Sequence, residues 1–510
     1  MKASFRGRLL ALGLVTALAG SMAVTTPAQS APVLNKAPLV ITRTADIDKV
    51  DPHLATAFQT VQTMGLVYNT LVQLNPDLSI APGLATKWAW SDGNKTLTFF
   101  LRKGVTFHNG AKFTSADVRA TFQRILDPAT GAVGRSNYTT INRIVTPDPY
   151  TVVFVLNDPS VPLLSALTDV NASIVSAADV KAGTVGKKPN GTGPFMWSSW
   201  KVGQSVTLKA NPKYWGGVPK ISGIVFRVIP TESSALAAVT AGSAQMALIS
   251  DPLVARTASK ALVTERVPSL AYHVLQMNAR HGALKDLNIR LAIQCAIDRK
   301  AVLQTAALGE GSITGPITSP AYRSDPNARP CPTRDLTKAK AYMAAAGNPS
   351  VTLSTIVPEG EYATADAEAQ TVQAELKDIG VNLDLQMLDS ATYVSRWLAG
   401  DFDAAIALNG GRIDPDTMYS RYFTSAGNLN KVAGYSSPTL DALFAQGVSN
   451  ANYAARKLVY KQISAELENN AVWIWMFTSY DYRVHTKKLV GFKPMANGSL
   501  FTLATAKYLK

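Results

Sequence analysis

The sequence predicts an α/β fold divided into at least two lobes, and three observations support this prediction. The chain has 510 residues, which is too many for a single hydrophobic core. Hydrophobic residues make up 47% and charged residues 17% of the chain, a balance typical of a folded globular protein. Strand-like and helix-like segments alternate through the second half, which favours a parallel sheet with helical crossovers.

In the first half, local patterns predict the following strands and helices. Strands are expected at residues 38–43 and 97–101, and runs rich in β-branched residues indicate further strands at residues 151–156 and 221–229. Amphipathic segments indicate helices at residues 58–68, 114–126 and 232–241. The helix at 114–126 has a start signal at Thr114 or Ser115 and a stop signal at Asp127-Pro128.

In the second half, helices and strands are expected in regular alternation. The first helix begins at Asp335 or Thr337 and ends at Gly347. The elements that follow, alternately strand and helix, are expected at residues 351–357, 362–378, 381–388, 391–399 and 402–408. We expect the strands among them to be parallel to one another.

The loop after the last of these strands is the first candidate ligand site. In open parallel α/β sheets, ligands bind beyond the carboxyl ends of the strands. Residues Asn409, Gly410, Gly411 and Arg412 begin this loop. Adjacent glycines allow a ligand to approach the backbone closely, and the arginine offers a planar fork to a carboxylate. The alternative is an ordinary glycine turn with a surface arginine.

Other candidate pocket residues are an early loop and several aromatic side chains. The candidates are Ala45, Asp46, Trp475, Tyr480, Tyr138, Trp397 and Tyr435. Aromatic rings provide stacking area and hydrogen-bonding edges for varied ligands. The alternative is that the aromatic residues pack in the core and that Asp46 caps a turn.

The first residues indicate an exported protein. Lys2, Arg6 and Arg8 precede an apolar run at residues 9–20, followed by small residues, so residues 1–31 are expected to be a secretory signal. Ser21 stands where a bacterial lipoprotein would have its lipidated cysteine, so we expect no lipid anchor. The mature protein is therefore expected to be soluble and periplasmic or secreted.

Charge and cysteine content restrict the classes of partner. The formal net charge is +15, but basic residues are scattered among acidic ones and gather only in pairs such as Lys187-Lys188. A nucleic-acid groove would need a basic stripe interleaved with aromatics, so no nucleic-acid partner is expected. In an exported chain, Cys295 and Cys331 could form a disulfide. The alternative for Cys295 is a buried thiol in a helix.

The motifs of catalysis are missing from the sequence, which favours binding without chemistry. The five histidines lack zinc-ligand spacing, and there is no G-x-S-x-G nucleophile elbow. Neither a complete P-loop nor a complete dinucleotide fingerprint occurs, so no cofactor and no metal are expected. A hydrolase with carboxylates dispersed along the sequence remains an alternative.

Several segments, taken together, resemble one family. The most specific runs through residues 90–118 and contains Trp90, Gly104 and Asn109-Gly110. Further matches follow at residues 51–52, 191–195, 211–215, 278, 287–300, 414–416 and 491–492. In this order, they resemble the extracytoplasmic binding proteins of the peptide/dipeptide/nickel ABC importers.

The resemblance implies a two-lobed periplasmic-binding-protein-like fold with an extra subdomain in the first lobe. Lobe I would span residues 32–268, with the subdomain at about 71–190. Lobe II would span residues 269–481, and residues 482–510 would return to lobe I. The chain would cross between the lobes near Pro268 and Tyr480, and the lobes would close around the ligand by a hinge.

The resemblance also implies a function: capture of a small solute, most often a peptide, and delivery to an ABC transporter permease by a monomeric, non-enzymatic protein. Peptide-binding members often hold the peptide amino group with an acid where this chain has Gly411, and a tryptophan is frequent where it has Leu408. These departures leave room for an anionic, modified or non-peptide solute. Asp46 could supply the missing carboxylate. A ligand sensor on the same fold is a further alternative.

Overall fold

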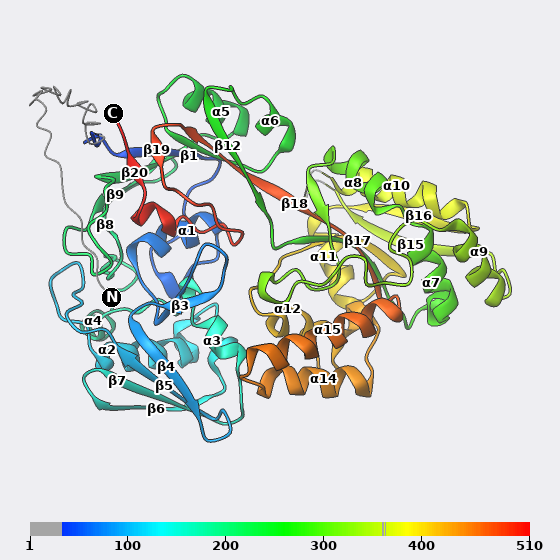
Figure 1. Ribbon diagram of the computed structural model, residues 1–510, viewed down its shortest axis with the longest axis horizontal. Helices are drawn as coiled ribbons and strands as arrows, with labels where there is room; N and C mark the ends of the chain where they lie inside the picture. The colour runs from blue at the N-terminus through cyan, green and yellow to red at the C-terminus, as the bar shows by residue number, and fades with distance from the viewer. Residues whose placement is uncertain (1–32, 360–361, 363) are drawn as a thin grey trace, which may run out of the picture. The chain divides into compact units, whose positions relative to one another are not determined.

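One long strand, β18 (Trp473–Thr486), connects two groups of strands into a 12-stranded sheet (Figure 1). The computed structural model describes residues 33–359, 362 and 364–510. Residues 473–479 of β18 pair with one group, and residues 480–486 pair with the other. Partner exchange therefore occurs at Tyr480, where the sequence predicts a crossing of the chain. The lobe boundaries themselves stay predictions.

The first group of strands contains the start of the chain. Its members are β1 (Leu39–Arg43), β8 (Phe195–Lys201), β9 (Ser205–Ala210), β10 (Gly223–Val228), β11 (Met246–Ile249) and β12 (Leu262–Pro268). Strand β1 is parallel to β10 and β11, and the other pairings are antiparallel. The predicted strands at 38–43 and 221–229 are confirmed as β1 and β10. Apolar side chains of these strands, such as Ile41 and Phe226, are buried in a hydrophobic core that packs against this sheet.

The second group is a mixed sheet rather than the purely parallel one expected. Its members are β13 (Tyr272–Met277), β14 (Gly311–Ile313), β15 (Val351–Pro358), β16 (Val381–Leu388) and β17 (Ala404–Asn409). Strand β15 is parallel to β16 and β17, as predicted, but β13 is antiparallel to β17 and β18. All residues of β13 are buried. The sequence patterns predict no strand at residues 272–277, where His273 and Gln276 interrupt the apolar residues, so they do not foresee this antiparallel neighbour.

A separate four-stranded sheet, of order β4-β5-β7-β6, forms within the segment expected to be an extra subdomain. Its strands are β4 (Ala85–Ser91), β5 (Thr96–Leu101), β6 (Ile141–Asp148) and β7 (Thr151–Leu156). Helix α2 (Ser115–Leu126) covers it and begins with a capping box between Thr114 and Asp117. Phe122 contacts the rings of Tyr138 and Phe154 edge-to-face. Aromatic rings therefore pack together with aliphatic side chains in the core between this sheet and α2.

The remaining elements cover the sheets and connect their strands. The helices are α1 (Phe58–Val67), α3 (Pro162–Ala166), α4 (Ala177–Ala182), α5 (Glu232–Thr240), α6 (Pro252–Arg256), α7 (Leu287–Ala296), α8 (Arg299–Ala307), α9 (Leu336–Ala345), α10 (Ala365–Lys377), α11 (Ser390–Ala399), α12 (Pro415–Phe423), α13 (Asn430–Ala433), α14 (Pro438–Ser449) and α15 (Tyr453–Asn469). Short 3₁₀ helices are η1 (Pro52–Leu54), η2 (Pro128–Thr130), η3 (Arg135–Tyr138), η4 (Val170–Ala172), η5 (Gly282–Lys285), η6 (Pro320–Tyr322) and η7 (Phe501–Ala504). Two strand pairs complete the fold: β2 (Val72–Leu74) with β3 (Ile80–Pro82), and β19 (Leu489–Val490) with β20 (Lys507–Tyr508).

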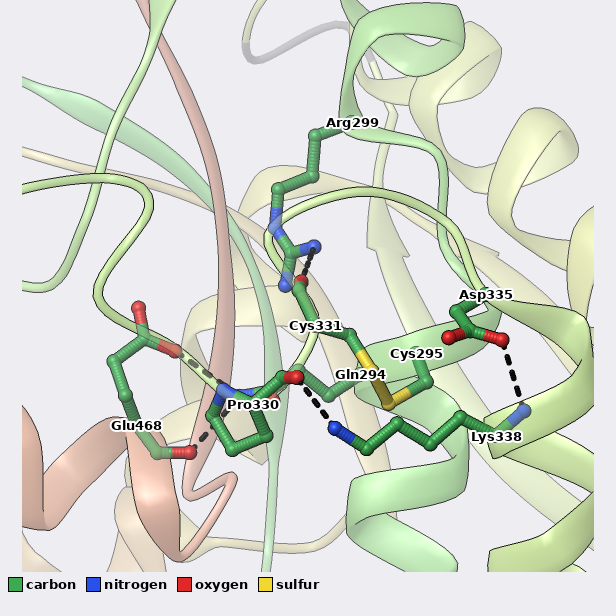
Figure 2. The surroundings of a disulfide bond; sticks show 8 residues. All are labelled: Gln294, Cys295, Arg299, Pro330, Cys331, Asp335, Lys338 and Glu468. Atoms are coloured by element: carbon green, nitrogen blue, oxygen red, sulfur yellow. Dashed lines mark hydrogen bonds between the residues drawn. A yellow bond between two sulfur atoms is a disulfide. The ribbon is translucent and has the colours of Figure 1, made fainter.

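A disulfide joins Cys295, in α7, to Cys331, in the segment before α9 (Figure 2). The expected bond is therefore present, and both cysteines are buried. The Cys331 carbonyl accepts a hydrogen bond from the Arg299 guanidinium at 3.5 Å. Beside it, Gln294 donates to the Glu468 carboxylate at 3.0 Å. The disulfide thus closes a long loop over a buried polar network.

The predicted secretory signal, residues 1–31, lies outside the described residues. In the part of the chain that is described, no helix combines the length and the apolar character that a membrane span requires.

Candidate functional site

A cavity of about 450 Å³ lies next to the loop that follows β17. Its size falls within the range of small-molecule sites, roughly 300–1,000 Å³. The residues that line it come from segments far apart in the sequence. They come from α1, from segments 68–74 and 168–173, from residues 269–271 between β12 and β13, from residues 410–413, and from residues 481 and 495–501.

Gly410 and Gly411 differ in whether the surrounding structure has room for a side chain. A side chain at Gly411 would overlap the Leu270 carbonyl oxygen, so only glycine lets this loop pack against the β12–β13 connection. A Cβ at Gly410 would meet no atom within 4 Å. Both residues line the cavity. The loop therefore approaches the cavity with bare backbone, as the adjacent glycines predict.

Arg412 also lines the cavity, and its side chain is exposed. Its carbonyl oxygen accepts a 2.7 Å hydrogen bond from the Ser319 hydroxyl. Within the described chain, no acceptor bonds its guanidinium group. The backbone at Arg412 is thus anchored while the charged end of the side chain is available for an anionic group.

Asp414 anchors the far end of this loop. Its carboxylate accepts two hydrogen bonds from the buried Arg456, at 2.6 and 2.8 Å, and caps α12 through the Asp416 backbone N–H at 2.9 Å. The Arg456 guanidinium also lies over the rings of Tyr322 and Tyr460. Burial, assisted by the neighbouring Asp414, raises the pKa of Asp416 to about 7. Asp414 is therefore a structural residue.

Asp169 is an acid in the cavity that the sequence analysis does not single out. Its side chain is partly buried, and burial raises its pKa to about 6, although the Arg412 charge acts in the opposite direction. Asp481 lines the same cavity. Burial raises the pKa of Asp481 as well, and Arg483, 3.7 Å away, opposes that rise. The cavity therefore holds both signs of charge.

The rest of the cavity lining includes apolar side chains and the Asn69 amide, which is hydrogen-bonded to other residues of the protein. Phe58, Leu270 and Met495 contribute apolar surface. The Asn69 side-chain oxygen accepts hydrogen bonds from Thr192 and Trp215, both at 3.0 Å. The Asn69 amide oxygen is therefore held by the fold, and the apolar side chains supply most of this part of the lining.

The early loop at Ala45 and Asp46 does not line the cavity. The Asp46 carboxylate accepts hydrogen bonds from the Trp200 indole N–H and the Gly203 backbone N–H, both at 2.8 Å. Ala45 is exposed. The Asp46 carboxylate therefore caps the turn between β8 and β9, as the alternative expects, and it is not among the residues that line the cavity.

The five aromatic candidates and Asn409 also lie outside the cavity lining. Tyr138 is buried, and its hydroxyl donates to the Ala166 carbonyl at 2.8 Å. Trp475 is fully buried in the core around β18. Asn409 is buried and donates to the Tyr272 hydroxyl at 3.3 Å.

The remaining three aromatic candidates have polar partners elsewhere. Trp397 donates to the Gln276 side chain at 2.6 Å. The Tyr435 hydroxyl lies 3.5 Å from the Glu466 carboxylate, and the Tyr480 hydroxyl lies 3.0 Å from that of Ser312. A core ring and a ligand-facing ring have the same local sequence pattern, so sequence alone does not separate them.

A buried relay resembles part of a hydrolase site. His273 Nδ1 lies 2.8 Å from the Glu368 carboxylate, and its Nε2 lies 3.4 Å from the Ser479 hydroxyl. The His273 ring stacks on Phe477 with centroids 4.2 Å apart. None of these residues is among those that line the cavity. Their hydrogen bonds join β13, β18 and α10. Among the described residues, no group of three His, Cys, Asp or Glu side chains is suited to hold a metal ion.

The fold and the cavity define the class of protein, a two-lobed solute-binding protein. The chain belongs to the bacterial extracellular solute-binding proteins, family 5, whose profile matches residues 79–430. The probable di/tripeptide-binding protein 5 of Pseudomonas aeruginosa (strain UCBPP-PA14) is 29% identical over 442 residues, 80% of this chain and 84% of that protein. The probable D,D-dipeptide-binding periplasmic protein DdpA of Escherichia coli (strain K12) is 27% identical, over 96% of both chains. The solved structure of HbpA2 from Haemophilus parasuis has the same fold, with a TM-score of 0.84, 24% identity, and coverage of 92% of this chain and 99% of that one.

Proposed function

We propose that this protein captures a peptide or peptide-like solute in the cavity beside residues 410–412 and delivers it to an ABC importer. The observation that carries the proposal is the bare loop after β17, which presents Gly410 and a free Arg412 guanidinium to a cavity of about 450 Å³. Relatives named as peptide-binding proteins support the ligand class. Arg412 would bind an anionic group such as a carboxylate.

The cavity is lined by segments that follow strands of each group, for example Gln62 of α1, which follows β1, and Arg412, which follows β17. A ligand that contacts both would favour the arrangement in which they lie closest. Hinge closure around the ligand is therefore part of the proposal. The permease would then recognise the closed, loaded protein.

Export completes the proposal. Residues 1–31 would be removed as a secretory signal, and Ser21 in place of a cysteine would leave the mature chain without a lipid anchor. The protein would then act as a soluble monomer, periplasmic or secreted, that does not change its ligand.

Melting curves with a ligand panel test this function. Free di- and tripeptides, N-acetylated peptides and sugars would each be added to the mature protein. A ligand present at about 100 times its dissociation constant stabilises the protein by about 2.7 kcal/mol, which is readily seen as a higher Tm. A rise with peptides supports the proposal. A rise with sugars alone contradicts the peptide class, and cleavage of any added compound favours the hydrolase alternative.

A further inference from the structure

A small polar niche adjoins the main cavity. It has a volume of about 20 Å³ and is lined by Asn137, Ser165, Asp169, Asp414 and Thr417, together with Arg412 and its neighbours. Asp169, Arg412 and Ile413 also line the main cavity, so the two spaces meet at these residues. A volume of this size holds about one water-sized group.

Most polar groups around the niche already have partners within the protein. The Asp414 carboxylate is bound by both Nη atoms of Arg456 and lies 3.4 Å from the Ser165 hydroxyl, which donates to it. The Thr417 hydroxyl donates to the Asp414 carbonyl at 2.9 Å. These groups have little capacity left for a ligand.

The Asp169 carboxylate is different. Across the described residues, no N–H or O–H group donates a hydrogen bond to it, although Arg412 is close enough for their charges to interact. A partly buried carboxylate without a hydrogen-bond donor is costly to the fold. Asp169 is partly exposed and lines the cavity, so a ligand can reach this carboxylate and supply the donors that the protein does not.

We propose that the niche is a subsite for a primary ammonium group, with the Asp169 carboxylate as its counter-ion. An ammonium group is about the size of a water molecule and carries three hydrogen-bond donors. The inference rests on the proposed function and narrows its ligand class.

Together with Arg412, this subsite would select a zwitterion. Asp169 would hold the ammonium group, and the free guanidinium of Arg412 would hold an anionic group of the same molecule. The backbone at Gly411 leaves no room for an acidic side chain there. Asp169 therefore supplies a negative charge from the segment before η4, in the niche that Arg412 also lines.

Paired probes with and without the ammonium group test this inference by calorimetry at pH 7.5. The probes are Ala-Ala and Ala-Ala-Ala, each with its N-acetylated counterpart. The test variant is Asp169→Asn, and the control is Asp158→Asn, which removes the same charge from an exposed residue of the same subdomain, 3.8 Å from Lys95. Circular dichroism checks that both variants fold.

We expect free peptides to bind the wild type and the Asp158→Asn control with equal affinity. To both proteins, the N-acetylated peptides should bind at least about tenfold more weakly than their free counterparts. Asp169→Asn should lose at least about tenfold in affinity for the free peptides and discriminate less between the two probe series. Equal binding of acetylated and free peptides, or an unchanged affinity in Asp169→Asn, would overturn the ammonium subsite and leave the proposed function standing. If no peptide binds the wild type, the peptide class and this inference fail together.

Discussion

Replacing Asp169 by asparagine should stabilise the folded protein near neutral pH. The folded-state pKa of Asp169 is about 6, against an ordinary value of 3.8, because burial disfavours the charged carboxylate. The difference corresponds to at most about 3 kcal/mol at 1.36 kcal/mol per pH unit. Arg412 and the Tyr138 hydroxyl are the ionisable groups that interact with this carboxylate.

The sign of the pH dependence follows from proton binding. Between about pH 4 and 6 the folded state keeps the Asp169 proton while the unfolded chain releases it, so the stability owed to this group falls as pH rises through that window. Above about pH 6 to 7 Asp169 is charged in the folded protein, so the full free-energy cost of burying its charge lowers the stability. The asparagine side chain of the variant carries no charge and escapes the cost, so the advantage of the variant should be small at pH 4 and largest at pH 7.5.

Urea unfolding of the ligand-free mature protein at pH 4.0 and 7.5 measures this effect. We expect the Asp169→Asn variant to be more stable than the wild type at pH 7.5 by about 1–3 kcal/mol, and nearly equal to it at pH 4.0. The Asp158→Asn control should match the wild type at both values. A variant that is less stable than the wild type at pH 7.5 would refute the reasoning, because it would show that Asp169 has stabilising partners.

Three further predictions concern the loop and the disulfide. Arg412→Ala should weaken the binding of a carboxylate-bearing peptide about 10- to 150-fold in calorimetry, and Arg412→Lys should lose less; equal affinity in Arg412→Ala would remove this residue from the site. Gly411→Ala should lower both Tm and affinity because its methyl group overlaps the Leu270 carbonyl, whereas Gly410→Ala should change neither; a normal Gly411→Ala protein would contradict the close packing. Replacing Cys295 and Cys331 by serine should lower the free energy of unfolding by about 2–4 kcal/mol without changing ligand affinity, and a variant as stable as the wild type would show that the closed loop contributes nothing.

Much of the fold follows from local sequence patterns. The strand predicted at 381–388 is β16 with the same bounds, and the strand at 151–156 is β7. Thr114 caps α2 as its side-chain chemistry predicts. These elements are local in origin, because the period of apolar residues and the capping residues lie within the element itself.

The site follows from sequence only where the fold positions it. Residues 410–412 follow a strand of a parallel pair, and that topological rule places them beside the cavity. Asp169 follows no such rule, because it lies in an irregular segment before η4 and reaches the cavity only through tertiary packing. Trp475 shows the converse, since a ring suited to a ligand is buried in the core instead.

Native mass spectrometry of the mature protein, purified gently from a bacterial periplasm, tests the central claim most directly when the wild type is compared with Gly410→Trp. The tryptophan would add a large ring at the edge of the cavity that Gly410 lines, where a Cβ meets no other atom within 4 Å, and Gly410→Ala is the matched control. We predict a discrete added mass on the wild type and on Gly410→Ala that is released on unfolding and is absent from Gly410→Trp. The same added mass on a folded Gly410→Trp protein would contradict the account, because the ligand would then bind outside the cavity beside residues 410–412.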